Sequence, residues 1–156
     1  MKTITILVGN IGSGKTTWIK KHRKKDDIVI SRDALRYMIG AGDYIFDVKI
    51  EPTIWATELF MVEEVMEKGF NIIVDEVGIN KALRNRYIQL AKIYDYNVIV
   101  VEMKKLTMKD SVDRRMNNPH SQPSRKIWEQ VWQKFDNMYE EPSKDEGIDK
   151  IIKCEF

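Results

Sequence analysis

An eight-residue motif near the start of the chain limits its possible folds more than any other feature. Gly9-Asn10-Ile11-Gly12-Ser13-Gly14-Lys15-Thr16 fits the pattern G-x-x-x-x-G-K-[ST] at every fixed position. This is the pattern of a P-loop, in which glycines let the backbone aim its N–H groups at phosphate oxygens. An apolar run, Thr3–Val8, precedes the motif and a helical pattern follows it, as expected for a P-loop between a strand and a helix.

The motif predicts which residues bind a nucleotide and its metal. We expect Lys15 to reach the β- and γ-phosphates of ATP, and the Thr16 hydroxyl to complete the coordination of Mg²⁺. The third predicted strand ends at Asp75-Glu76, and an acid at this place orients the metal or its water. We take Asp75 as this acid, with the neighbouring Glu76 as a second candidate and a solvated acidic strand end as the alternative. The residues expected to bind the nucleotide are Gly9, Asn10, Ile11, Gly12, Ser13, Gly14, Lys15, Thr16 and Thr17.

Apolar, β-rich segments alternate along the chain with helical patterns, which predicts βαβ units. Their near-continuous Ile and Val content is typical of strands that helices cover on both faces. We therefore predict an α/β P-loop NTPase fold, a parallel sheet flanked by helices, in a single domain spanning residues 1–156. Strands are expected at Thr3–Val8, Ile28–Ser31, Asn71–Asp75, Val98–Glu102 and Lys150–Cys154. Helices are expected from Gly14 or Lys15 towards Lys24, and at Glu51–Lys68, Lys81–Tyr94, Thr107–Met116 and Ser124–Tyr139.

The second predicted strand ends at Ser31-Arg32-Asp33, and Arg36 follows one helical turn later. In a parallel sheet the ligand crevice lies at the carboxyl ends of the strands, so Asp33 shares an edge with the P-loop. A carboxylate there can accept the proton of an attacking hydroxyl, and Arg36 can hold a phosphate of the substrate. The alternative is that Asp33 caps a helix at Ala34–Ile39, a position where Asp is common.

Two arginines lie just before a segment, Asn117–Pro123, whose prolines interrupt the helical pattern. We expect residues 107–125 to form a helical lid. Arg114 or Arg115 would then close over the γ-phosphate and neutralise charge in the transition state. The alternative is a solvated helix face with intrahelical ion pairs.

With these residues placed, the chain resembles the kinase domain of polynucleotide kinases, P-loop enzymes that phosphorylate 5′-hydroxyl ends of DNA or RNA. The resemblance covers Met1 to about Tyr139. It rests on the P-loop, Ser31-Arg32-Asp33-x-x-Arg36, Asp75, and the arginine-bearing lid with Gln122-Pro123 after it.

The resemblance implies a role for each matching residue. Asp33 would be the general base, and Arg36 would contact the phosphate beside the 5′ nucleoside. Lys15 and Thr16 would act on ATP and the metal. The chain departs from the family at two places: the third strand continues Asp75-Glu76-Val77 instead of Asp-Thr/Ala-Asn, and Asn118 replaces a second lid arginine.

These residues predict an enzyme that transfers the γ-phosphoryl group of ATP to a hydroxyl, and the resemblance names the 5′-OH end of a polynucleotide as the acceptor. Two alternatives remain open. A P-loop kinase of nucleosides, sugars or antibiotics would use the same donor site. A nucleotide-dependent switch or ATPase would need neither an acceptor nor the carboxylate of residue 33. The predicted catalytic residues are Lys15, Asp33, Arg36, Arg114 and Arg115.

The composition adds only broad limits. The single cysteine, Cys154, excludes a disulfide within the chain and makes a reducing, cytoplasmic setting the expected one. No apolar run approaches the length of about 18 residues that a membrane span needs, so we expect no membrane partner. The net charge of +2 decides nothing about nucleic acid, and the oligomeric state stays open.

Weaker patterns each allow two interpretations. For the basic run Lys20–Lys25 we favour a solvated helix end over a nucleic-acid contact. Three cations after the third strand belong either to a strand-binding wall or to a solvated surface: Lys81, Arg84 and Arg86. Three aromatic residues near the loop Gly40–Asp47 either stack on a base or pack in the core: Tyr37, Tyr44 and Phe46. The four tryptophans are expected to be packing residues: Trp18, Trp55, Trp128 and Trp132.

Overall fold

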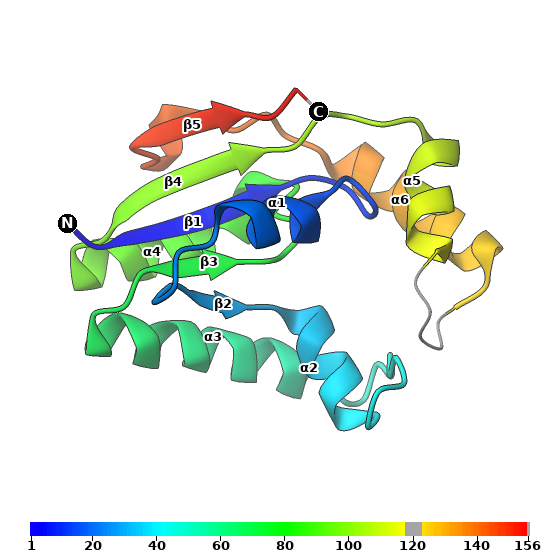
Figure 1. Ribbon diagram of the computed structural model, residues 1–156, viewed down its shortest axis with the longest axis horizontal. Helices are drawn as coiled ribbons and strands as arrows, with labels where there is room; N and C mark the ends of the chain where they lie inside the picture. The colour runs from blue at the N-terminus through cyan, green and yellow to red at the C-terminus, as the bar shows by residue number, and fades with distance from the viewer. Residues whose placement is uncertain (118–122, 156) are drawn as a thin grey trace.

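Five parallel strands form one sheet, in the order β2-β3-β1-β4-β5, in a computed structural model that describes residues 1–117 and 123–155 (Figure 1). This confirms the predicted α/β P-loop fold with helices on both sides of a parallel sheet. The strands are β1 (Thr3–Val8), β2 (Ile28–Ile30), β3 (Ile72–Val74), β4 (Asn97–Glu102) and β5 (Lys150–Lys153). The helices are α1 (Lys15–His22), α2 (Arg32–Ile39), α3 (Glu51–Lys68), α4 (Lys81–Tyr94), α5 (Met108–Met116), α6 (Arg125–Met138) and the short 3₁₀ helix η1 (Lys144–Glu146).

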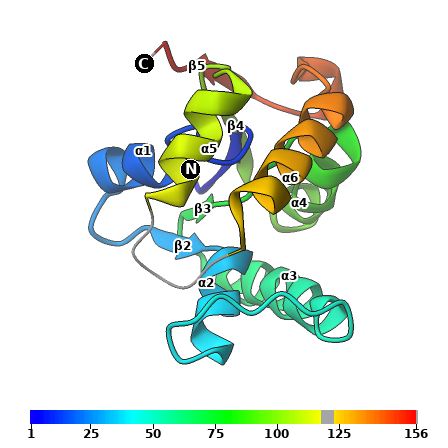
Figure 2. The same cartoon turned by 90° about the vertical axis from the view of Figure 1, so that its right-hand side faces the viewer.

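Two apolar clusters lie on the two faces of the sheet. The larger one joins β-strand residues such as Ile4 and Ile6 to Val62 and Met66 of α3 and to Ile88 of α4. The smaller one places Ile19 of α1 against the opposite face, beside Leu7 and Val101. Figure 2 shows the same division, with α1 on one side of the sheet and α3 and α4 on the other. Burial on both faces explains why the strands read as continuous Ile and Val runs.

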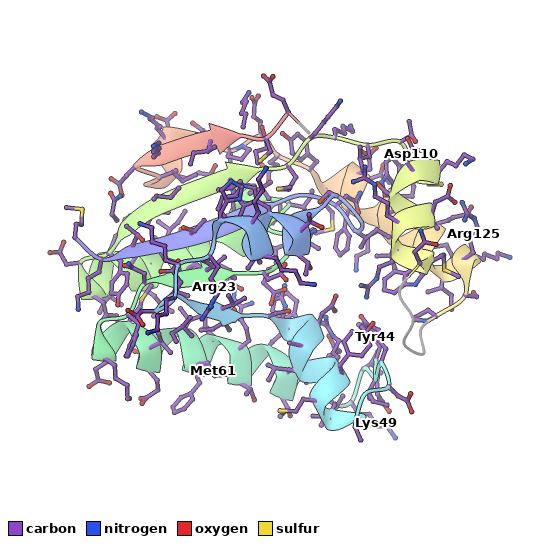
Figure 3. The ribbon with its side chains drawn as sticks, viewed as in Figure 1. Arg23, Tyr44, Lys49, Met61, Asp110 and Arg125 are labelled. Carbon is purple, nitrogen blue, oxygen red and sulfur yellow. The ribbon has the colours of Figure 1, made fainter. Side chains whose placement is uncertain are left out.

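The helix boundaries follow local signals. Gly69 ends α3 in a left-handed conformation (φ 84°), as its position after the apolar stripe predicts. The P-loop helix ends at His22, two residues earlier than expected, because Arg23 turns to an extended conformation (ψ 130°). The basic residues that follow are exposed, and Figure 3 places Arg23 away from α5 and α6. The predicted interruption at Asn117–Pro123 falls largely on residues 118–122, which lie outside the described residues.

The strand order positions the functional groups. The central strand β1 pairs with β3 on one side, and β3 pairs with β2. At the carboxyl ends of these strands, the P-loop follows β1, Asp33 follows β2 and Asp75 follows β3. Because all three strands run in the same direction, the three groups meet at one edge of the sheet.

Candidate active site

The P-loop has the backbone that phosphate binding requires. Gly12 (φ 63°) and Gly14 (φ 97°) both adopt left-handed conformations, which side chains disfavour. The Lys15 ammonium folds back and donates to the carbonyl oxygens of Gly9 (2.9 Å) and Asn10 (2.8 Å). Burial lowers the pKa of Lys15 to about 8, and the nearby Asp75 and Asp33 limit that fall. Lys15 is therefore held within the loop, next to the place where phosphates bind.

Two oxygen groups lie side by side where the sequence predicts the metal. The Thr16 hydroxyl donates to Asp75 Oδ2 at 3.4 Å. Burial raises the pKa of Asp75, and the Lys15 ammonium acts against this rise. A hydroxyl and a carboxylate beside a phosphate site suit Mg²⁺, which takes oxygen ligands and commonly keeps only one or two from the protein. The residues present therefore fit this metal.

Asp33 is not the helix cap that the alternative interpretation suggests. Ser31 caps α2, since its hydroxyl accepts from the Ala34 backbone N–H at 3.2 Å. The Asp33 carboxylate instead receives side-chain donors, Arg36 Nη1 (2.8 Å) and the Tyr44 hydroxyl (3.3 Å) on Oδ1 and Arg115 Nη2 (3.4 Å) on Oδ2. Its side chain keeps 42% of its surface exposed. The carboxylate is thus oriented by neighbouring side chains and remains accessible.

Arg36 is a buried arginine held by two acids. Its Nε and Nη2 donate to the two carboxylate oxygens of Glu51 at 3.0 and 2.6 Å, a bidentate pair, while Nη1 donates to Asp33. Glu51 begins α3, on the far side of the loop that follows α2. Sequence reasoning missed Glu51, because nothing in its local pattern marks it as the partner of an arginine 15 residues earlier.

Two helices pack directly on the P-loop: α5, which lies in the predicted lid of residues 107–125, and α6, which follows it. We call them the lid helices. Ile11 is buried in a cluster with Val112 of α5 and with Trp128 and Trp132 of α6, which confirms a packing role for these two tryptophans. The Asn10 side-chain amide donates to the Trp132 carbonyl at 3.0 Å. The two variable positions that follow Gly9 thus connect the phosphate-binding loop to the lid.

The two lid arginines point to different parts of the site. Arg114 Nη1 lies 3.9 Å from where a Cβ on Gly14 would be, so it faces the P-loop. Arg115 reaches Asp33, and its guanidinium stacks on the Trp128 ring at 4.4 Å and near the Tyr44 ring at 5.7 Å. Figure 3 shows Tyr44 on the side of the α2–α3 loop that faces the lid, with Lys49 farther away. Tyr44 therefore packs between the α2–α3 loop and the lid helices instead of presenting a free ring face on which a base could stack.

The proposed strand-binding wall after β3 does not form as a set. Arg84 is fully buried and donates to Glu146 Oε1 (2.8 Å) and to the Gly78 carbonyl (2.8 Å). Arg86 lies over the Trp55 ring at 4.7 Å, and of the three only Lys81 is exposed. Arg84 is thus a structural residue that anchors η1 to α4, and the wall hypothesis is wrong for it.

A cavity of about 520 Å³ adjoins the P-loop on the side of β4 and β5. Gly9 and Asn10 line it together with Glu102 and Cys154, which lie at or just beyond the ends of these strands, and Trp132 of α6. Ser111 also lines it, and the Ser111 hydroxyl and the Trp132 indole nitrogen are both buried and have no hydrogen-bond partner among the described residues. Lys15 and Asp33 are not part of its lining, so the cavity lies beside the part of the sheet edge that carries these two residues.

Comparison with known proteins agrees with this geometry. The sequence profile of an AAA domain family (AAA_33) matches residues 4–142. The chain belongs to this family. An L-seryl-tRNA(Sec) kinase of Methanococcus maripaludis is 24% identical over 142 residues, which cover 85% of this chain and 52% of that protein.

Solved structures share the fold. A chain of the Pnkp1/Rnl/Hen1 RNA repair complex has a TM-score of 0.68 at 17% identity, over 88% of this chain and 45% of that one. A shikimate kinase of Acinetobacter baumannii has a TM-score of 0.57 at 17% identity, over 100% of this chain and 86% of that one. This chain spans about half the length of the seryl-tRNA kinase and of the repair protein. At these identities the structural matches show a shared fold. No helix in the described part of the chain is long and apolar enough to cross a membrane.

Gly12→Ala tests whether the lid supports the P-loop. A Cβ at Gly12 would lie 2.1 Å from the Ser111 carbonyl oxygen of α5, in a backbone conformation that side chains disfavour. We expect ATP binding, measured by calorimetry, to weaken about 10-fold or more. Relief of this clash would displace the loop, and about 1–3 kcal/mol of strain would then be needed to restore its phosphate-binding backbone. Gly42→Ala is the matched control, since Gly42 also has a positive φ but no atom within 4 Å of its Cβ position. Equal ATP affinities for the two variants would show that the lid contact does not matter.

Proposed function

We propose that this protein transfers the γ-phosphoryl group of ATP to a hydroxyl bound beside Asp33, and that this hydroxyl is the 5′-OH end of a polynucleotide. The observation that carries the proposal is the position of the Asp33 carboxylate. It contacts Arg115 of the lid and is near enough to Lys15 and Asp75 to influence the pKa of both. A candidate base, a phosphate-binding lysine and a metal-side acid thus share one edge of the sheet.

Each group has a defined task in this proposal. Asp33 accepts the proton of the attacking hydroxyl, while Lys15 exchanges its carbonyl partners for phosphate oxygens. Thr16 and Asp75 would hold Mg²⁺, which would neutralise the phosphate charge. Arg114 faces the P-loop and so stabilises the γ-phosphoryl group during transfer, whereas Arg115 orients the base.

Arg36 retains the capacity to bind an acceptor phosphate. A guanidinium has five N–H donors. Glu51 accepts one from Nε and one from Nη2, and Asp33 accepts one from Nη1. One donor on each Nη remains for a phosphate oxygen. Glu51 fixes the plane of the guanidinium, which limits the entropy lost when the acceptor binds.

The layout of the sheet separates donor from acceptor. In-line transfer requires the attacking and leaving oxygens on opposite sides of the γ-phosphorus. Asp33 and Arg36 follow β2, at one end of the strand order, and the cavity lies towards β4 and β5 on the other side of β1. We therefore assign the cavity to the nucleoside of ATP, whose nucleobase would lie against its lining, which includes Ser111 and Trp132.

The residues around the proposed acceptor site favour a nucleic acid as the molecule that carries the hydroxyl. The Phe46 ring is 60% exposed and lies 5.6 Å from the Arg36 guanidinium, so an aromatic face and a phosphate-binding cation are adjacent. This pair suits a base and its phosphate, whereas a small sugar acid would use only the cation. The named substrate of the Methanococcus relative, seryl-tRNA, and the RNA repair complex support RNA as the first polynucleotide to test.

The test is an acceptor screen with γ-labelled ATP. RNA and DNA oligonucleotides with a 5′-OH end are offered beside the same oligonucleotides with a 5′-phosphate, and beside nucleosides, shikimate and gluconate. We expect label only on the 5′-OH oligonucleotides. Label on small molecules alone would establish the small-molecule kinase instead. Release of labelled phosphate at one rate, whatever acceptor is present, would establish the switch or ATPase.

Phe46→Ala tests the stacking surface within this proposal. Stacking of one base on an aromatic side chain contributes about 1–3 kcal/mol, so we expect the KM for a 5′-OH oligonucleotide to rise about 5- to 100-fold with kcat and the KM for ATP unchanged. Phe46→Trp should retain the low KM. Val48→Ala is the control, because Val48 is 77% exposed in the same loop and aliphatic. An unchanged KM in Phe46→Ala would remove Phe46 from the acceptor site.

A further inference from the structure

A buried carboxylate one residue beyond Asp75 contacts the segment that carries Asp33. Glu76 follows β3, and its side chain is 7% exposed. Its Oε1 accepts a hydrogen bond from the Arg32 backbone N–H at 2.6 Å, and its Oε2 lies 3.0 Å from Arg32 Nε. Arg32 is the first residue of α2 and the direct neighbour of Asp33. Both carboxylate oxygens of Glu76 thus act on the residue beside the proposed base.

The Arg32 backbone N–H is one of the amides at a helix start that no carbonyl of the same helix can accept. Ser31 satisfies the Ala34 amide but leaves that of Arg32. Glu76 provides the missing acceptor from another strand, and a carboxylate at this end also matches the helix dipole. The start of α2 is therefore tied to β3 as well as to β2, which precedes it.

The Arg32 side chain is fixed on its other side by α3. Its guanidinium carbon lies 3.5 Å above the Trp55 ring, and the residue is only 6% exposed. Residue 32 is thus held by a carboxylate and an aromatic ring, on two different elements. The side chain of Asp33, the next residue, is 42% exposed. The backbone beside Asp33 is therefore fixed, while its carboxylate remains accessible to solvent.

We propose that Glu76 is a positioning residue for phosphoryl transfer: through the Arg32 backbone amide it sets the place of the Asp33 carboxylate relative to the P-loop. This inference rests on the proposed role of Asp33 as the base. Glu76 itself does not touch the acceptor. The positioning of Asp33 depends on the length of the Glu76 side chain and on its hydrogen-bonding oxygen more than on its charge. This is because the contact to the Arg32 amide defines where α2 begins.

Three substitutions separate length from charge. Glu76→Ala removes the acceptor, and displacement of a reacting group by about 1 Å can lower a rate about 100-fold, so we expect kcat to fall about 10- to 100-fold. Glu76→Gln retains an oxygen at the same distance and should stay within about 5-fold of the parent kcat. Glu76→Asp retains the charge on a shorter stem and should lower kcat more than Glu76→Gln does. The KM for ATP should change little in all three. A higher kcat for Glu76→Asp than for Glu76→Gln would overturn the proposal.

A double-substitution cycle shows whether Glu76 acts through Asp33. In the Asp33→Ala background, Glu76→Ala should lower the residual kcat no further. If Glu76 acts only through Asp33, the effects of the two substitutions on kcat are not additive. An equal loss of kcat in both backgrounds would overturn the positioning role while leaving the base in place. If Asp33→Ala alone retains full turnover, the proposed function fails first.

Glu58→Gln is the matched control for a purely structural effect. Glu58 is a fully buried acid on α3 whose carboxylate faces Tyr87 and lies in the electrostatic surroundings of Arg32, whereas the Arg32 backbone amide donates to Glu76. Its substitution should change Tm without a selective loss of kcat. If the kcat values of Glu76→Ala and Glu58→Gln both simply follow the fraction of folded protein, then Glu76 supports the fold only and the proposal is wrong.

Discussion

Asp33→Ala is expected to lower kcat for phosphoryl transfer by about 10²- to 10⁴-fold, the range that a positioned general base contributes. The Kd for ATP should stay within about 3-fold of the parent value, because P-loop amides, Lys15 and Thr16 hold the phosphates without Asp33. Single-turnover transfer to a 5′-OH oligonucleotide measures the first quantity, and calorimetry measures the second.

Asp33→Asn refines this test. The amide keeps the size of the carboxylate and an oxygen for Arg36 and Tyr44, but it cannot accept the proton of the acceptor. If Asp33 is the base, Asn should be as inactive as Ala. Substantial activity in Asp33→Asn would show that the residue serves to hold Arg36 and Arg115 in place. Full activity in both variants would remove Asp33 from the mechanism.

Residues that act through their neighbours in sequence were predictable. The P-loop needs glycines, a lysine and a hydroxyl at fixed spacing, and the adjacent apolar run forms β1 as expected. Asp33 and Asp75 were placed correctly at the sheet edge because both directly follow strands, and parallel strands end at a common edge. The Gly69 helix stop is equally local, since it depends on one positive φ.

Residues that act through distant partners were not predictable. Glu51 reads as an ordinary acid and Glu76 as a second candidate beside Asp75 for the metal-side acid. Only the fold brings Glu51 to Arg36 and Glu76 to the Arg32 amide. The sequence suggests that Arg84 is a surface cation. In the structure it is buried and pairs with Glu146, 62 residues later. A periodic pattern identifies which face of a helix is apolar, but it contains no information on which charge that face will meet.

The lid shows both situations within two residues. The sequence predicts an arginine over the γ-phosphate but leaves Arg114 and Arg115 equivalent, because both lie on the same short helix. Neighbouring helical residues point about 100° apart, so packing of α5 on the P-loop must direct them to different targets. Val112 and Ser111 are buried against the P-loop region, and this orientation turns Arg114 towards Gly14 and Arg115 towards Asp33.

Arg114→Ala is accordingly expected to lower kcat by about 10³-fold or more, as removal of an arginine that neutralises phosphoryl-transfer charge does in related chemistry. The loss should appear in the transition state: binding of ADP with aluminium fluoride should weaken by a similar factor, while binding of ADP alone changes little. Arg115→Ala should instead alter the use of the acceptor, since Arg115 contacts the base and not the P-loop.

Arg125→Ala is the matched control for Arg114. Arg125 begins the other lid helix and pairs with Asp113 at 2.6 Å, and Figure 3 shows it on the outer side of the lid. Its loss removes one lid cation without removing a group beside the P-loop, so kcat should stay within about 3-fold. Equal losses in Arg114→Ala and Arg125→Ala would mean that the lid needs positive charge in general. A loss in Arg115→Ala alone would exchange the two roles and make Arg115 the residue that stabilises the phosphoryl group.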